Sequence, residues 1–372
     1  MSSTNSLLSP VSPSPEMPAA SSLPSERETK RRPLAAASAV NARTLVGIEV
    51  GMVGARIASL KQFHPDVEKY RWVGRFDFSF PAESGPFNRQ RATECIRTLA
   101  ERLPRCMDGD RNEAVIGLPL HWMQLQTTFG TEVDSFVDSS EQHFAESGFE
   151  GNSHISYWPV VGEHHGKPKQ EDQYVVATLP ETLIIELVDA VARQGYSVRS
   201  ALPTPVALNH AAFPLTGIDA QCLVSLDQHS ASISVQHRSG IGLTRKLPSL
   251  VSQSKDDVPV TDSSALSPYL RQLSKAIRET LVFSSRSDMS SLSNKPVLIT
   301  GELAETEGIE SKLATQLEMP VAVWSLLGTA GPAATDSGES DEPTPLRDSC
   351  RFASAISLAR TATCTGDWGY EG

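Results

Sequence analysis

Apolar positions along the chain recur with two periods, and the order of these periods is the same in both halves. In the first half, TLVGIEVG (44–51) and ARIASLKQ (55–62) predict a hairpin with glycines at its turn, and YRWVGRFDFSF (70–80) predicts a third strand. Apolar residues at helical spacing predict a helix over 88–103, and AVIGLPL (114–120) predicts a buried strand. The first unit therefore reads strand-strand-strand-helix-strand.

The second half repeats this unit and then extends it. The predicted elements are strands at 222–227, 231–237 and 241–247, a helix over 268–283, a strand at 297–300, a helix over 304–317 and a strand at 319–325. A duplicated unit of this kind predicts two related lobes. The arrangement is that of an α/β, actin-like (ribonuclease H-like) fold, in which two such lobes face each other across a cleft.

An insertion over residues 121–202 separates the two units. It contains a polar helical stretch (138–147), strands at 153–161 and 174–179, a helix that starts at Pro180 and ends at Gly195, and a strand at 196–203. Helices and strands that alternate in this way predict a small α/β subdomain inserted in the first lobe. The lobes themselves are expected at 43–120 and 203–360, the second closing with a helix.

Three segments lack any apolar period. Residues 1–42 are rich in Ser, Pro and Ala, and such a segment buries too little surface to offset its ordering entropy, so a disordered tail is expected. The loop 335–346 has the same character, and residues 361–372 form a loose end.

Charge and cysteine content narrow the classes of function. The 33 Lys and Arg against 44 Asp and Glu give a net charge of -11, which argues against nucleic acid as the main partner. Five cysteines without CxxC spacing indicate reduced thiols in a cytoplasmic protein, and His164-His165 lies in a polar run that favours a solvated loop over a metal site. Uncharged stretches are broken by Pro or Gly, so no direct membrane insertion is expected.

Five segments in the right order carry a resemblance to a known family. They are the hairpin GIEVGMVGAR (47–56), the stretch 176–212, TRKLP (244–248), VLITGELAETEGIESKLATQLEMPVAVW (297–324) and FASAISLAR (352–360). Over residues 44–360 the chain resembles the PilM family of type IV pilus assembly proteins, which is related to the division protein FtsA.

The resemblance implies a nucleotide cleft, in which two glycine-rich hairpins cradle the phosphates of ATP and an acid on each holds hydrated magnesium. In the first hairpin, Glu49 stands where the family has Asp, and Arg56 stands where it has Lys. Gly51 and Gly54 keep the turn feasible. The cofactor-binding residues on this side are therefore expected to be Glu49, Gly51, Gly54 and Arg56.

The second hairpin and the adenine turn depart further from the family pattern. Asp227 can serve as the second magnesium-side acid, although another register places Ser225 there, and Gln228-His229 replaces the expected apolar-Gly pair. At the adenine turn the family's double glycine becomes Gly301-Glu302. These changes predict that ATP with magnesium binds weakly or no longer binds. On the alternative interpretation, the glycines and Glu49 merely form turns.

The resemblance also implies a role. Family members are cytoplasmic scaffolds of a type IV pilus or the related type II secretion system. They bind the short cytoplasmic tail of a PilN-like membrane protein beside the inserted subdomain and link it to the motor ATPase.

Two alternatives remain. An active ATPase or small-molecule kinase needs a general-base Asp in the cleft, and no candidate loop offers one beyond Asp227. An FtsA-like division protein normally ends in an amphipathic membrane helix, which the final TATCTGDWGYEG does not resemble.

Overall fold

The computed structural model describes residues 43–62, 70–81, 87–106, 112–159, 172–216, 220–237, 240–250, 263–284, 295–324 and 350–362. The predictions made for residues 1–42, for the loop 335–346, for residues 363–372 and for the His164-His165 pair fall outside this part of the chain.

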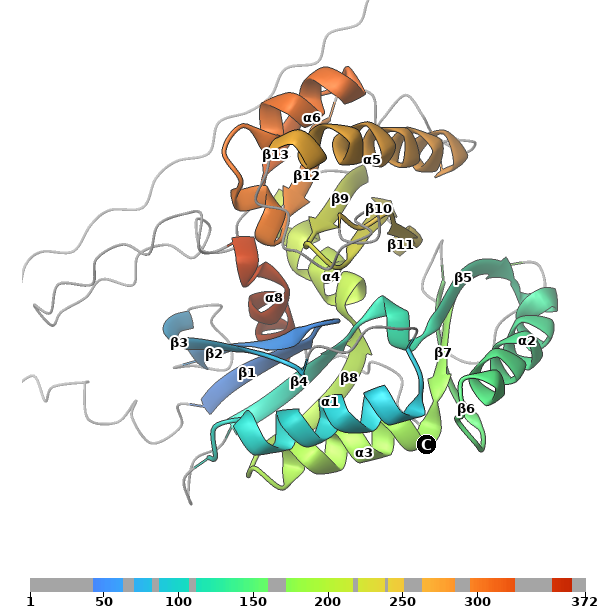
Figure 1. The fold of residues 1–372 in the computed structure, drawn as a ribbon, viewed down its shortest axis with the longest axis vertical. Helices are drawn as coiled ribbons and strands as arrows, with labels where there is room; N and C mark the ends of the chain where they lie inside the picture. The colour runs from blue at the N-terminus through green and yellow to red at the C-terminus, as the bar shows by residue number, and fades with distance from the viewer. Residues whose placement is uncertain are drawn as a thin grey trace, which may run out of the picture.

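Two five-stranded mixed sheets form the framework, one in each lobe (Figure 1). The first sheet has the order β3-β2-β1-β4-β8, and the second has the order β11-β10-β9-β12-β13. In each, the first three strands form an antiparallel meander and the last two run parallel to the central strand. The predicted duplication is therefore confirmed. The strands are β1 (Arg43–Val50), β2 (Gly54–Gln62), β3 (Tyr70–Ser79), β4 (Asn112–Leu118), β8 (Ser197–Pro203), β9 (Ala220–Leu226), β10 (Ala231–His237), β11 (Gly240–Leu247), β12 (Val297–Thr300) and β13 (Val321–Val323).

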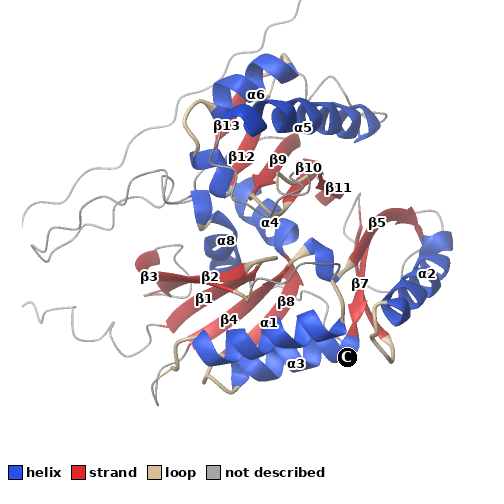
Figure 2. Ribbon diagram, viewed as in Figure 1, coloured by secondary structure: helices blue, strands red, loops and turns tan. Residues whose placement is uncertain are grey.

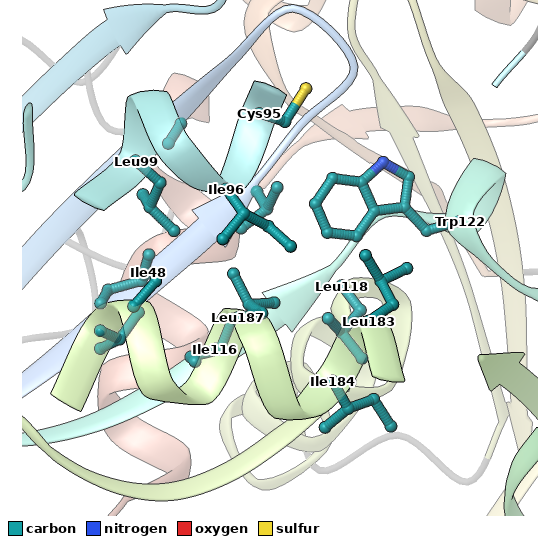
Figure 3. Packing of buried hydrophobic residues seen from close by; sticks show 14 of the residues in the cluster. Ile48, Cys95, Ile96, Leu99, Ile116, Leu118, Trp122, Leu183, Ile184 and Leu187 are labelled. Atoms are coloured by element: carbon teal, nitrogen blue, oxygen red, sulfur yellow. The ribbon is translucent and has the colours of Figure 1, made fainter. Parts of the chain in front are cut away.

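Helices α1 (Arg89–Arg102) and α3 (Glu181–Ala192) pack side by side on one face of the first sheet (Figure 2). The side chain of Asn88 begins α1 by accepting a hydrogen bond from the backbone N–H of Arg91 at 2.9 Å. The apolar faces of both helices meet the sheet in a core of fully buried side chains (Figure 3). Among its members are Ile48, Leu99, Ile116, Trp122, Leu183 and Leu187.

The inserted subdomain is smaller than the sequence predicted. It consists of a three-stranded antiparallel sheet with helix α2 packed against it, built from β5 (Gln124–Phe129), α2 (Val133–Glu146), β6 (Ser153–Pro159) and β7 (Gln173–Pro180). The predicted boundary of 121–202 extends too far, because α3 packs on α1 and β8 pairs in parallel with β4. Helix α3 and strand β8 thus complete the first lobe as α6 and β13 complete the second. Local periodicity identified this strand but could not say which sheet it joins.

Two helices lie between the sheets. Helix α4 (Thr204–Thr216) is absent from the predicted elements, and it carries Pro205 in its first turn, where proline is tolerated. The closing helix α8 (Ala353–Thr361) was expected in the second lobe, but it packs against β1, β2 and β4 of the first. Together with α4, which contacts β4 and β8, it covers that side of the first sheet. Leu45, Leu208, Leu223 and Ile356 share the resulting central core.

The outer face of the second sheet is covered by α5 (Ser263–Ser284) and α6 (Ile309–Leu317), and a short helical turn, η7 (Glu302–Glu305), follows β12. Figure 1 shows α5 and α6 at the end of the molecule remote from α1 and α3. Across the described part of the chain, no helix combines the length and the apolar character that a membrane crossing requires.

Candidate functional site

The two hairpin turns that the sequence singled out face each other across the cleft between the lobes. They lie in corresponding places, since β1–β2 and β9–β10 are the same hairpin of the duplicated unit. Between them is a cavity of about 400 Å³, lined by residues 49–56 of the first turn, residues 227–232 of the second, and Glu302. The structure therefore brings all the predicted acidic and basic site residues to one place.

Arg56 lies at the centre of this group. Its Nη1 is 2.9 Å from Oδ1 of Asp227 and 3.5 Å from Oε2 of Glu49, and its Nη2 is 3.4 Å from Oε2 of Glu302. The guanidinium is 17% exposed. Glu49 is the residue opposite Arg56 in the register of β1 and β2, whereas Asp227 and Glu302 belong to the second lobe. One cation thus joins the two lobes.

The protonation of Glu49 is finely balanced. Its burial raises the pKa to about 7, the charge of Arg56 opposes that shift, and the charge of Asp227 adds to it. Burial also lowers the pKa of Arg56, but Asp227, Glu49 and Glu302 more than compensate and hold it above its ordinary value. Arg56 therefore stays charged, and it is the main source of positive charge for a buried carboxyl.

The second-lobe acids are held by further hydrogen bonds. Oδ1 of Asp227 accepts the backbone N–H of Glu302 at 3.1 Å as well as the contact from Arg56. Nε2 of Gln228 donates to Oε1 of Glu302 at 3.5 Å. Ser225, the alternative in the other register, also lines the cavity, but the carboxylate that reaches Arg56 is that of Asp227.

The glycines of the site have local structural roles. Gly301 has φ +95°, and a Cβ at this position would lie 2.5 Å from the carbonyl oxygen of Leu226. A Cβ on Gly54 would lie 2.2 Å from the carbonyl oxygen of Phe78, so the turn packs directly against β3. The N–H of Gly51 closes that turn by donating to the carbonyl of Gly54 at 2.8 Å. Backbone packing alone accounts for glycine at 54 and 301.

These residues do not fit a magnesium–nucleotide complex as arranged. Hydrated magnesium would need the carboxylates of Glu49 and Asp227 to face a space that admits the ion and its waters, but the Arg56 guanidinium lies between them. Within the described residues, no three His, Cys, Asp or Glu side chains converge on a possible metal position. The cleft instead provides its own cation.

The far end of the cavity contains residues that sequence reasoning missed. His121 follows β4 and Lys246 lies in β11, and both line the cavity. Burial lowers the pKa of His121 to about 3, and the charges of Lys246 and Arg91 add to this effect. Burial also lowers the pKa of Lys246. Lys246 lies in the TRKLP segment, but nothing in the sequence marks it or His121 as a cavity residue, and only the tertiary structure places them together.

A second ion pair crosses between the lobes near the cavity. Nη2 of Arg351 lies 2.7 Å from Oδ2 of Asp77 in β3, and the Arg351 backbone N–H donates to Oε1 of Glu305 in the second lobe at 2.8 Å. Arg351 precedes α8 in a segment without a recognisable pattern, so no signal in the sequence identifies it.

Comparisons with known proteins show the fold. No protein-family model matches the sequence, and no curated protein matches it. A solved structure described as a PilM-PilN type IV pilus biogenesis complex is similar over 86% of this chain and 98% of that chain, with a TM-score of 0.62 and 14% sequence identity. This similarity shows an α/β actin-like fold with two mixed five-stranded sheets and a small antiparallel sheet.

Two further solved structures are similar to this chain, but the similarity is too weak to support an argument. The ethanolamine utilization protein EutJ from Carboxydothermus hydrogenoformans has a TM-score of 0.44 and 13% identity, over 85% of this chain and 89% of that chain. The cytoplasmic domain of EpsL, an inner membrane component of the type II secretion system of Vibrio cholerae, has a TM-score of 0.36 and 10% identity, over 84% and 95% of the two chains.

Proposed function

We propose that this chain is a cytoplasmic, PilM-like scaffold of a type IV pilus or type II secretion machine, and that its cleft does not turn over ATP. The observation that carries the proposal is the Arg56 guanidinium, which occupies the space between Glu49, Asp227 and Glu302 in a fold shared with PilM. A scaffold needs the fold and a binding surface, but it needs no space for phosphates between the two hairpins.

The proposed partner is a PilN-like membrane protein, bound through its short cytoplasmic tail, with a motor ATPase as a second partner. The similar solved structure is a complex of PilM with PilN. The small inserted sheet offers an edge for such a tail at β6, an outer strand on which Ile155 is exposed. Exposed apolar side chains on edge strands suit an extended peptide.

Titration calorimetry tests the proposal. The purified full chain is titrated with synthetic peptides that reproduce the cytoplasmic segments of short single-span proteins encoded beside its gene. We expect one peptide to bind, and we expect Ile155→Ser to weaken it by at least roughly tenfold, which corresponds to 1.4 kcal/mol. Ile185→Ser is the matched control, since Ile185 is exposed on α3, away from the small sheet.

An enzymatic result would overturn the proposal. If no such peptide binds, and if the chain binds ATP at low micromolar concentration and releases phosphate in a reaction abolished by Asp227→Ala, then the chain is an ATPase of the same fold.

A further inference from the structure

The outward face of α5 is basic, although the protein as a whole is acidic. Arg271, Lys275 and Arg278 are spaced four and three residues apart, which places them on one side of the helix. All three are exposed, and the side chain of Lys275 is 79% exposed. Glu279 is the acid beside them, in an open pair with Lys275 at 3.9 Å. This basic face contrasts with the net charge of -11.

The basic face surrounds a shallow recess rather than a flat surface. Arg271, Lys275 and Arg278 line a cavity of about 340 Å³ together with Ser274, the carboxylate of Glu279 and Gln316 of α6. Arg278 donates a hydrogen bond to the backbone carbonyl of Gln316, and Ser274 donates to its side-chain oxygen at 3.0 Å. These bonds tie α5 to α6, so the positions of the cations are supported by the body of the second lobe.

Two exposed apolar side chains lie beyond the cations, near the end of α5. Val282 lies four residues beyond Arg278, and Phe283 is next to it; their exposed fractions are 60% and 61%. They are among the most exposed large apolar side chains in the described part of the protein. Exposed apolar surface therefore lies beside the cations, and a bilayer interface offers contacts for both: anionic headgroups for the cations and the acyl boundary for the apolar side chains.

We propose that the basic face of α5, with Val282 and Phe283, docks on the anionic headgroups of a phospholipid bilayer. The inference rests on the proposed function, in which a partner tail brings the chain to the membrane. The recess accepts headgroup phosphates, and Phe283 contacts the interface without crossing it. At physiological salt the Debye length is about 8 Å, so the acidic groups of more distant surfaces repel the bilayer little.

The contact is weak by itself and gains from the partner. Each cation near an anionic surface contributes about 1 kcal/mol, or roughly fivefold in binding, so the three together contribute roughly 100-fold. A tail bound at another site raises the effective concentration of α5 at the bilayer. Together the two contacts would orient the second lobe toward the membrane.

Vesicle flotation of the purified full chain tests the proposal. The probes are vesicles of phosphatidylcholine with about 30% phosphatidylglycerol and vesicles of phosphatidylcholine alone, at millimolar lipid and about 0.1 M salt. We expect binding to the anionic vesicles only, with loss at high salt. Replacing Arg271, Lys275 and Arg278 by Gln should weaken it roughly 100-fold, and Phe283→Ser should weaken it further.

A matched control distinguishes the effect of the α5 cations from that of the total charge of the protein. Replacing Arg97, Arg193 and Arg199 by Gln removes three exposed cations from other surfaces, and we expect it to leave vesicle binding unchanged. Equal losses in both triple variants would overturn the proposal, as would a wild-type chain that ignores anionic vesicles but binds a polyglutamate peptide.

The tail-peptide titration of the same α5 variant keeps the two proposals distinct. If the wild-type chain binds no vesicles and the α5 variant still binds the peptide, only the membrane contact is refuted. A wild-type chain that binds no peptide refutes the proposed function instead.

Discussion

The guanidinium of Arg56 lies 2.9 Å from the carboxylate of Asp227, and these two residues belong to different lobes. The resemblance to the PilM family predicts phosphates and hydrated magnesium in the space between these hairpins. Here an internal cation compensates the acids. The lobes are therefore joined by a contact that requires no ligand, and a nucleotide would have to displace Arg56 before it could approach both turns.

Removing Arg56 should destabilise the protein strongly. Arg56→Met leaves Glu49, Asp227 and Glu302 without their cation, and breaking a largely buried ion pair costs roughly 3 kcal/mol of the free energy of unfolding. Urea denaturation measures the loss. Arg97→Met is the control, because Arg97 pairs with Glu94 and Glu101 on the exposed side of α1. This substitution should leave the midpoint of urea denaturation unchanged. Equal midpoints for the two variants would contradict the prediction.

Glu49 should make stability depend on pH. Its pKa rises from the ordinary value of 4.5 to about 7 on folding, so its contribution to stability is complete below about pH 4.5 and is lost as the pH rises through 7. Glu49→Gln removes this loss. Between pH 5 and pH 7.5, the free energy of unfolding of the variant should rise by on the order of 2 kcal/mol relative to that of the wild type, as measured by urea denaturation. Glu101→Gln, on the exposed side of α1, should show no such gain. A constant difference between Glu49→Gln and wild type would refute the assignment.

Gly301 should tolerate no side chain. Gly301→Ala adds a Cβ at φ +95° and places it 2.5 Å from a backbone oxygen, so the variant should lose about 1–2 kcal/mol of stability to the strain of a positive φ and more to the clash. Gly151→Ala separates these two costs, since Gly151 has φ +101° with nothing within 4 Å of an added Cβ. Thermal or chemical unfolding of both variants gives the comparison, and equal losses would mean that the turn shifts freely.

Opening the cleft should restore some affinity for nucleotide. Wild-type chain should bind ATP with magnesium weakly and hydrolyse it negligibly. Changing His229 and Glu302 together to Gly removes two side chains from the cavity and one partner of Arg56, so calorimetry should show at least roughly tenfold tighter binding. Glu318→Gly, at a positive φ outside the cavity, is the control. Unchanged affinity in the double variant would show that these side chains do not obstruct the cleft.

The sequence by itself determined the order of the elements, the duplication and the two hairpins. These features are encoded locally: alternation of apolar residues marks a strand and a helical period marks a helix, whatever they later pack against. The acids and the arginine of the hairpins were named in advance only through the resemblance to the PilM family, because they stand at positions of its motif. Helix α4 and strand β5 are the exceptions: prolines in the first and last turns of α4 obscure its period, and β5 is absent from the predicted elements.

Only the tertiary structure decided how these elements are combined. Strand β8 pairs with β4, and α8 covers the first sheet, because buried faces there needed partners that no local pattern specifies. The environment of Arg56 depends on the same long-range assembly. Its partner Glu302 is 246 positions away, and the two meet because the fold places the β1–β2 hairpin of one lobe opposite the turn after β12 of the other. Spacing along the chain carries no information on such a meeting, since ion pairing depends on distance in space.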